Sequence, residues 1–272
     1  MKKRIKIMLG IMTSILLITL VCGCSIYMKE PVVVKSLISS DDMDVDIMYI
    51  SGMVGSKKIK SVEIPDAPKD IKTVVYDEES EILSGYSLHT AHLGVNSDNL
   101  TEEGGLTEPI SFNKLNITWD DGSKTTADVG SIQIQSGARD MLEAQEANSN
   151  YKKDKRIDDS QTFQAPRNMK ITQIEIPYQE EVEKMVSSLT VNDVPVSEID
   201  EQHPIELKKG GTFKVHCRYN DNFQTLYGRI WINMRLMGED GQGKKQEAVF
   251  VISPDTKIEE NIPEYLKQAR KE

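Results

Sequence analysis

Polar and apolar positions alternate along most of this chain, which is typical of β-strands with one buried face. Val45, Ile47 and Tyr49, for example, are separated by single intervening residues. Between two such runs, Asp121 and Gly122 predict a hairpin turn, because both residues tolerate positive φ. The alternation and the β-branched composition predict strands at 45–50, 59–64, 71–76, 110–119, 125–129, 169–178, 189–191, 205–207, 212–219, 227–236 and 247–252.

The pattern changes character in three places. Residues 137–166 are largely polar, with a possible short helix over 138–148, and we expect them to form a linker. A second short helix is expected over 179–187, and a third, exposed one over 258–271. Many short strands with Gly, Asn and Asp turns favour β-sandwiches over α/β units. The expected fold is therefore mainly β.

We expect two β-sandwich domains in tandem, joined by the partly helical linker and followed by a short C-terminal helix. The predicted boundaries are 31–136 for the N-terminal β domain, 137–166 for the linker, 167–256 for the C-terminal β-sandwich domain and 257–272 for the helix or tail. Residues 58–65 and 170–177 are identical at five of eight positions. A tandem repeat and a chance match between strands both explain this identity. The second half loosely resembles the immunoglobulin-like domains of exported bacterial proteins, without their cysteine and tryptophan hallmark.

The N-terminus carries the marks of an export signal. A cationic start, Lys2 to Lys6, precedes an apolar run from Ile7 to Val21, which is short for a membrane span. The run ends in Val21-Cys22-Gly23-Cys24, which resembles the lipobox of bacterial lipoproteins. This resemblance implies a signal peptide over 1–23, a lipid on Cys24, a short tether over 24–30 and a location on the extracytoplasmic face of a bacterial membrane. An uncleaved helical anchor is the alternative, and it also places the remainder outside.

Removal of the signal would take four basic residues away and change the net charge from −10 to about −14. A protein this acidic is repelled by nucleic acid and by anionic surfaces, unless a local patch reverses the sign. Cys217 would be the one cysteine left free, so stability must come from apolar cores and not from disulfides. Cys217 alternates with Val215 and Tyr219 and is expected in the core.

Motifs for catalysis and cofactor binding are missing from the sequence. It contains no G-x-S-x-G, no P-loop and no H-E-x-x-H. His89 and His92 have a spacing that suits one metal on a helix, but the surroundings indicate strand or loop. Asp42, Asp44 and Asp46 resemble the start of a calcium loop, yet its sixth and twelfth positions are Ile47 and Met53. We therefore expect no enzyme, no cofactor and no metal site.

The one candidate binding surface comes from two strands near the C-terminus. Alternation places the apolar residues of 212–219 and 227–236 on one face and the polar residues on the other. If these strands pair, their outer face carries a cationic aromatic stripe. The stripe consists of Lys214, His216, Arg218, Arg229, Trp231 and Arg235.

Three functions follow as alternatives. The first is a non-catalytic surface lipoprotein that serves as a binding or accessory module for an envelope protein partner. The second is a module that binds anionic wall polymer or glycan through the stripe, because Trp and Arg often anchor interfaces. The third is an enzyme with an unrecognised site. A solvated sheet face with no ligand also explains the stripe.

Overall fold

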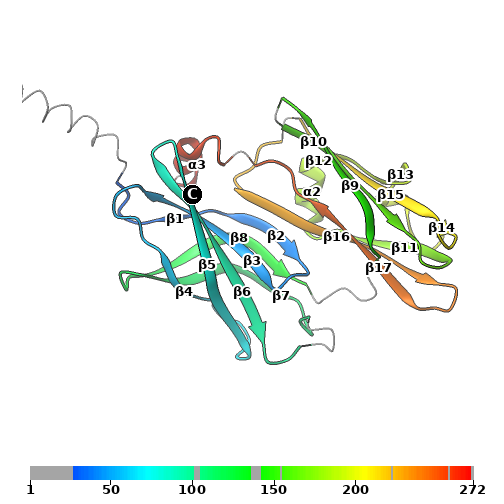
Figure 1. The fold of residues 1–272 in the computed structure, drawn as a ribbon, viewed down its shortest axis with the longest axis horizontal. Helices are drawn as coiled ribbons and strands as arrows, with labels where there is room; N and C mark the ends of the chain where they lie inside the picture. The colour runs from blue at the N-terminus through cyan, green and yellow to red at the C-terminus, as the bar shows by residue number, and fades with distance from the viewer. Residues whose placement is uncertain are drawn as a thin grey trace, which may run out of the picture.

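The computed structural model describes residues 27–100, 105–135, 142–153, 155–221, 223–256 and 258–270. The fold is mainly β, as the alternation predicted, and its strands form three sheets (Figure 1). The signal peptide and Cys24 lie outside the described residues, so their predictions stand as made.

The N-terminal sheet has four strands. In spatial order they are β1 (Val32–Val33), β3 (Asp44–Gly52), β6 (Tyr86–Ser97) and β5 (Ile71–Leu83). The C-terminal sheet has five strands. In spatial order they are β13 (Val194–Pro195), β12 (Val186–Val191), β15 (Thr212–Tyr219), β10 (Lys155–Gln164) and β9 (Ala144–Lys152).

The central sheet runs through both halves of the molecule. In spatial order its strands are β14 (Ile205–Leu207), β11 (Met169–Glu175), β16 (Arg229–Asp240), β2 (Ser36–Ser40), β8 (Lys124–Ile134), β7 (Ile110–Trp119) and β4 (Ile59–Glu63), and β17 (Lys245–Ile252) also pairs with β16. Two helices, α2 (Gln179–Met185) and α3 (Ile262–Ala269), and a short 3₁₀ turn at Val196–Glu198 complete the described part.

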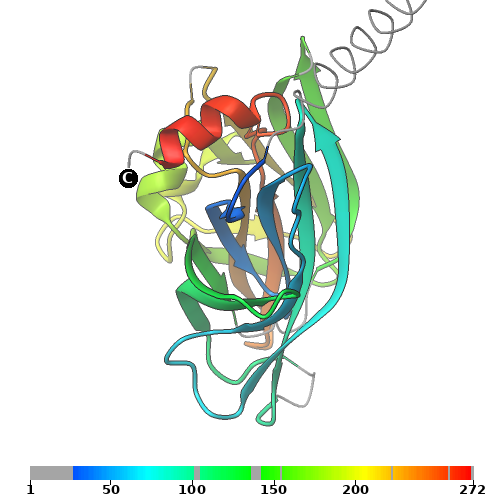
Figure 2. The ribbon, with the colours of Figure 1, turned by 90° about the vertical axis from the view of Figure 1, so that its left-hand side faces the viewer.

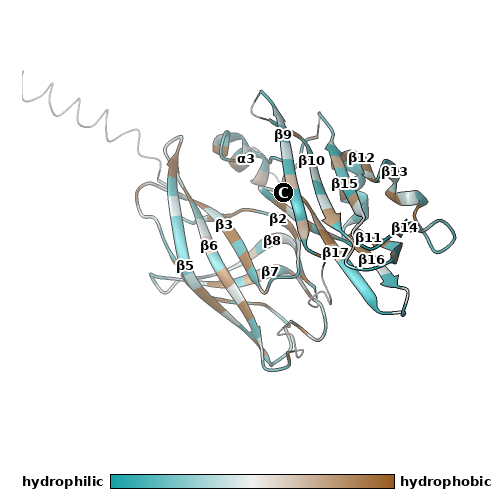
Figure 3. Ribbon diagram, turned by 45° about the vertical axis from the view of Figure 1, so that its right-hand side comes forward, coloured by the Kyte–Doolittle hydropathy of each residue, from teal (hydrophilic) through white to brown (hydrophobic). Residues whose placement is uncertain are grey.

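Each half has its own apolar core, because the alternating strands place one row of side chains between two sheets. Figure 3 shows this alternation as brown and teal bands along the strands. In the N-terminal half, Tyr49 and Leu93 of the N-terminal sheet meet Trp119 of the central sheet, and all three are fully buried. In the C-terminal half, Phe163 and Phe213 stack with ring centroids 5.1 Å apart. Burying each large apolar side chain contributes roughly 1.5–3 kcal/mol.

The two halves are joined through hydrogen-bonded strands and not only through a chain crossing. The start of β16, Arg229–Ile232, pairs in parallel with Ser36–Ser39 of β2, and later residues of β16 pair with β11. On its other side β2 pairs with β8. Gly130 allows this close approach, because a Cβ there would lie 2.2 Å from the Ser36 carbonyl oxygen.

The predicted linker is wrong in its secondary structure. Residues 144–152 and 155–164 form a hairpin, β9 and β10, and β10 pairs with β15 within the C-terminal sheet. The predicted helix is also wrong for 144–148, which belong to β9; residues 136–141 lie outside the described part. Every residue of β9 is exposed, so this edge strand carries no apolar alternation that would mark it as a strand.

The predicted hairpin between β7 and β8 is confirmed. The Gly122 amide donates to the Trp119 carbonyl at 3.0 Å, and the Trp119 amide donates to Ser123 at 2.9 Å. Gly122 has φ of 82°, a conformation that glycine adopts without steric cost. The Asp-Gly pair was therefore a correct turn signal.

The C-terminal helix occurs as α3 and lies beside β1 (Figure 2). The Asn261 side chain caps it by accepting from the Glu264 amide. Ile262 and Leu266, four residues apart, are buried in a third cluster with Met28 and residues of the N-terminal sheet. Helix α3 therefore covers part of the outer face of this sheet. None of the helices in the described part of the chain has the length and apolar character that a membrane span needs.

Candidate metal centre on the N-terminal sheet

The part of the outer face beyond α3 carries carboxylates, and the strand register brings them together. Asp46 of β3 and Asp77 of β5 lie opposite His92 of β6, one on each side. These three residues form a row across three adjacent strands. Side chains in such a row have Cβ atoms about 4.5–5.5 Å apart and therefore interact.

A β-bulge determines which carboxylates face His92. The register of β5 on β6 shifts between Val75 and Asp77, so Tyr76 is the extra residue. Val75 packs into the core before the bulge, and strict alternation would turn Asp77 toward the core as well. The bulge reverses this order and places Asp77 and Glu79 on the outer face.

His92 is held in one orientation by a charged neighbour. Its Nδ1 lies 2.6 Å from Asp46 Oδ1, and Asp46 Oδ2 lies 2.5 Å from Arg229 Nη1 at the start of β16. An ionised carboxylate only accepts hydrogen bonds, so Nδ1 donates to Asp46, and in the neutral imidazole the lone pair is then on Nε2. The chain of contacts from Arg229 to His92 therefore presents Nε2 as an acceptor or a metal ligand.

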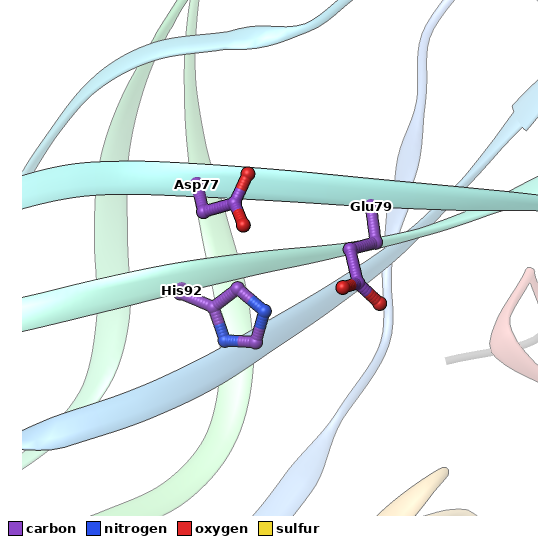
Figure 4. A group of neighbouring side chains, drawn as sticks. All are labelled: Asp77, Glu79 and His92. Atoms are coloured by element: carbon purple, nitrogen blue, oxygen red, sulfur yellow. The ribbon is translucent and has the colours of Figure 1, made fainter.

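Asp77, Glu79 and His92 can each direct one ligand atom to a common point, and these atoms lie within 4.8 Å of one another. Figure 4 shows the carboxylate of Glu79 beside one ring nitrogen of His92, with Asp77 next to them. Asp77 and Glu79 are exposed, while His92 is partly buried. Asp46, the carboxylate that contacts His92, forms an ion pair with Arg229. Within the described part of the chain, this is how a basic residue is linked to the group.

An aromatic ring closes one side of the group. Tyr76 stacks near His92 with ring centroids 6.0 Å apart. A Cβ on Gly94 would lie 3.5 Å from the Tyr76 ring and 3.3 Å from Asp44 Oδ1, so the bare glycine leaves room for both. Desolvation, followed by the charges of Asp44 and Asp46, raises the pKa of Tyr76. The carboxylates of the outer face therefore contribute to this shift after desolvation.

His89 lies on the opposite face of β6 and takes no part in this group, because three positions along a strand reverse the side-chain direction. It stacks on Tyr49 at 4.4 Å, and its Nε2 lies 2.9 Å from Ser51 Oγ. Burial lowers the pKa of His89, against the opposing charge of Glu78. The Nδ1 of His89 lies 3.3 Å from Glu78 Oε1, but neither atom has a hydrogen-bond partner in the described structure. The contact is therefore electrostatic and not a directed hydrogen bond.

A cleft of about 420 Å³ adjoins the candidate centre. Thr90, which neighbours His92 on the same face of β6, lines one wall, and Arg229 lines another. Tyr151 and Arg156 of the β9–β10 hairpin also line the cleft. The hairpin that the sequence presented as a linker thus forms part of the surroundings of the candidate centre.

The structure does not bring the residues of the predicted stripe together. The prediction assumed that β15 pairs with β16, and this pairing is wrong. Strand β15 lies between β10 and β12, whereas β16 pairs with β17, β2 and β11. The apolar faces of β15 and β16 do meet in one core, as predicted. Because the two strands belong to sheets that pack face to face, their polar faces point away from each other.

The six predicted residues are therefore divided among separate environments. Lys214, His216 and Arg218 share the outer face of the C-terminal sheet, where His216 Nε2 is 3.5 Å from Asp158. Arg229 pairs with Asp46 of the other half. Arg235 is buried and pairs with Asp41 and with Glu247. Trp231 is partly exposed, at 38%.

Cys217 is completely buried in the C-terminal core, where the alternation placed it. Burial is the main cause that raises the pKa of its thiol, and the charge of Asp159 adds to the shift. The thiolate is the reactive form of cysteine, so this environment disfavours reaction. The expectation of an inert core residue agrees with this placement.

Sequence reasoning missed Asp77 and Glu79. The available signal was an interruption of the β alternation, because Tyr76 and Asp77, which both carry polar groups, directly follow Val75. Such an interruption is compatible with a bulge but equally with the end of a strand. The partner residue His92 lies fifteen positions later, so no local motif connects the three.

Comparisons with known proteins do not identify a family. No family model and no curated protein matches the chain. A protein of unknown function from Porphyromonas gingivalis W83 is similar in structure, with TM-score 0.25 and 9% identity, over 81% of this chain and 99% of that one. A structure of manganese lipoxygenase of Gaeumannomyces graminis with part of zonadhesin of Komagataella pastoris gives TM-score 0.20 and 10% identity, over 84% and 94%. Both TM-scores are too low to support an argument about fold or function.

Proposed function

We propose that this chain is a non-catalytic lipoprotein, anchored through Cys24 to the extracytoplasmic face of a bacterial membrane. It serves there as a binding or accessory module for an envelope protein partner. The lipobox residues Val21 to Cys24 support the anchor. The single structural observation that carries the proposal is a group of exposed apolar side chains around Tyr27, which follows Cys24 by three residues in the sequence.

This apolar end consists of residues from three parts of the chain. Tyr27 forms a bridge with Val54, and Met53 precedes Val54 directly. Ile82 pairs with Ser87, which pairs in turn with Ser51 two residues before Met53. The exposed fractions are 67% for Tyr27, 44% for Met53, 52% for Val54 and 64% for Ile82. Grouped exposed apolar side chains mark contact sites for proteins or membranes.

The place of Cys24 in the sequence favours the membrane as the surface that this apolar end contacts. Cys24 precedes Tyr27 by three residues, which span at most about 11 Å of extended chain. Met28 is buried against the fold, so residues 27–30 are not the free tether that the sequence suggested. Two or three acyl chains on Cys24 anchor a protein stably. The apolar end would therefore rest on the bilayer, and the β9–β10 hairpin and the C-terminal sheet would remain accessible to a partner.

Metabolic labelling with an alkyne palmitate tests the anchor in intact bacteria. We expect labelling of the wild-type protein, its complete loss in Cys24→Ala and full retention in the matched control Cys22→Ala. Labelling that persists in Cys24→Ala contradicts the lipid anchor and supports the uncleaved helix. A polarity-sensitive dye on Met53→Cys, compared with one on Lys209→Cys, then tests whether the apolar end lies at the bilayer.

The partner is tested by crosslinking on intact cells followed by mass spectrometry. Reproducible capture of one envelope protein, lost when surface residues of the crosslinked face are exchanged, supports the accessory role. Capture of wall polymer, or of lipid alone, contradicts it.

Binding of an anionic wall polymer or glycan is the second candidate. It now depends on Lys214, His216 and Arg218 alone, because they share one outer face. Binding by such a patch weakens with salt. Salt-sensitive sedimentation with purified cell wall that is lost in Arg218→Ala would favour this candidate over a protein partner.

For the finer architecture we propose two immunoglobulin-like β-sandwiches that share the central sheet. The support is the presence of one core between two sheets in each half. The pairing of β2 with β16 makes the halves one connected sheet, so we expect them to unfold together. Two separate unfolding transitions in calorimetry would instead indicate independent tandem domains.

A further inference from the structure

We propose that Asp77, Glu79 and His92 bind one divalent transition-metal ion, with zinc as the representative ion. The proposal is independent of the lipid anchor, because all three ligands lie within the folded N-terminal sheet. An imidazole nitrogen and two carboxylate oxygens are a donor set that zinc accepts. The set is more than a group of acidic residues, because the imidazole supplies the nitrogen that transition metals prefer over calcium or magnesium.

The distances fit with small side-chain adjustments. Tetrahedral zinc has ligand bonds of about 2.0–2.2 Å, which places ligand atoms roughly 3.4 Å from each other. The atoms offered by Asp77, Glu79 and His92 lie within 4.8 Å of one another. Asp77 and Glu79 are exposed, so a change of rotamer can close this difference while His92 remains fixed. For Asp77 this change replaces the hydrogen bond that its Oδ1 accepts from the Glu78 amide at 2.8 Å.

Asp46 acts as the residue that positions His92 for this role. Ligating histidines almost always donate their second ring N–H to a carboxylate or carbonyl, which sets the tautomer and raises ligand basicity. The 2.6 Å contact from His92 Nδ1 to Asp46 Oδ1 is this arrangement, with Asp46 held in turn by Arg229. The nitrogen that remains is the one beside Glu79 in Figure 4.

The bulge at Tyr76 and the local charge give independent support. Without the bulge, Asp77 and Glu79 would face the core and could not meet His92. With it, Asp46, Asp77 and Glu79 gather on one face, with Arg229 as the basic residue in contact with the group. Adjacent like charges on a sheet face are destabilising. A divalent cation would remove that repulsion. Three protein ligands also leave a fourth position for water or a partner group.

The test is calorimetric titration of zinc into the full-length lipidated protein in detergent, after treatment with a chelator. We expect one site whose affinity falls more than about 100-fold in His92→Gln, and by about 10–100-fold in the positioning variant Asp46→Asn. Asp77→Asn and Glu79→Gln each weaken binding as well. Cobalt used in place of zinc should give a visible absorption that is lost in His92→Gln.

The matched control is His203→Gln. His203 also contacts an aspartate, with 3.2 Å between His203 Nδ1 and Asp200 Oδ1, but it lies on an exposed turn away from the sheet. Its exchange should leave the zinc affinity unchanged. Circular dichroism of the metal-free His92→Gln protein shows whether the variant folds, and Glu79→Gln supplies a second fully exposed position if it does not.

Three results overturn the proposal. The first is no zinc binding at millimolar concentration by the wild-type protein. The second is an affinity that His92→Gln leaves unchanged. The third is calcium binding that is tighter than zinc binding and insensitive to His92, which would show a purely acidic site.

Discussion

The two faces of the N-terminal sheet give two histidines on the same strand opposite surroundings. On the inner face, His89 is buried against Tyr49 and two serine hydroxyls. On the outer face, His92 contacts Asp46 and lies beside Asp77 and Glu79. The residue type and the strand are the same, and the side-chain direction alone separates them.

The difference shows how a single sheet separates stability from binding. The inner face excludes water, so its side chains, including His89 with its hydrogen bond to Ser51, fill the core. The outer face keeps charged groups in contact with solvent, where ligands can reach them. We therefore expect exchanges on the inner face to change the free energy of unfolding, and exchanges on the outer face to change metal binding.

The largest effect is expected for the apolar core of the inner face. Leu93→Ala removes a fully buried side chain of β6 and should lower the free energy of unfolding by about 2–5 kcal/mol. Thr90→Ala, on the outer face of the same strand, should change it by no more than about 0.5 kcal/mol. Urea unfolding of both variants checks this, and equal losses would show that the two faces do not differ as described.

A smaller effect is expected for His89→Gln, at about 1–3 kcal/mol, because the buried Ser51 hydroxyl loses its hydrogen bond with His89 Nε2. Burial lowers the pKa of His89 in the folded protein. The unfolded chain therefore takes up a proton first, as the pH falls through about 6.5. The stability that depends on His89 is complete above that pH and decreases below it, down to the folded pKa. Denaturation curves from pH 8 to 5 should be less steep in pH for His89→Gln, and an unchanged pH dependence would contradict this.

The smallest effect on metal-free stability is expected for His92→Gln, within about 0.5 kcal/mol, because His92 lies on the outer face. Zinc should separate the two proteins. At a hundredfold excess over its dissociation constant, zinc should stabilise the wild type by about 2.7 kcal/mol and the variant far less. Thermal unfolding with and without zinc measures this difference. An equal zinc effect in both proteins would show that zinc binds at a site other than His92.

Much of the fold could be predicted because its cause is local. The Asp121-Gly122 turn determines a hairpin by backbone preference, and the alternation around Cys217 determines a core position. Helix α3 was expected near the C-terminus, and Asn261 supplies its cap. These features depend on residues within a few positions of one another.

The remaining features depend on partners far away in the chain. Strand β9 is exposed along its whole length, and it pairs with β10. The stripe failed as a prediction because the pairing of β15 and β16 was assumed, and both strands pair elsewhere. Asp77 meets His92 only through the register of β5 on β6, which the bulge at Tyr76 sets.

The sequence by itself determined the mainly β character, the hairpin turn and the inward position of Cys217, and it predicts the export signal. Each follows from composition, from the two-residue period of strands or from the conformational freedom of glycine. Only the tertiary structure decided that Asp46, Asp77, Glu79 and His92 share one face, and that Arg229 from the other half reaches Asp46. The physical reason is that register and sheet order arise from contacts between distant strands, which the local pattern of side chains does not encode.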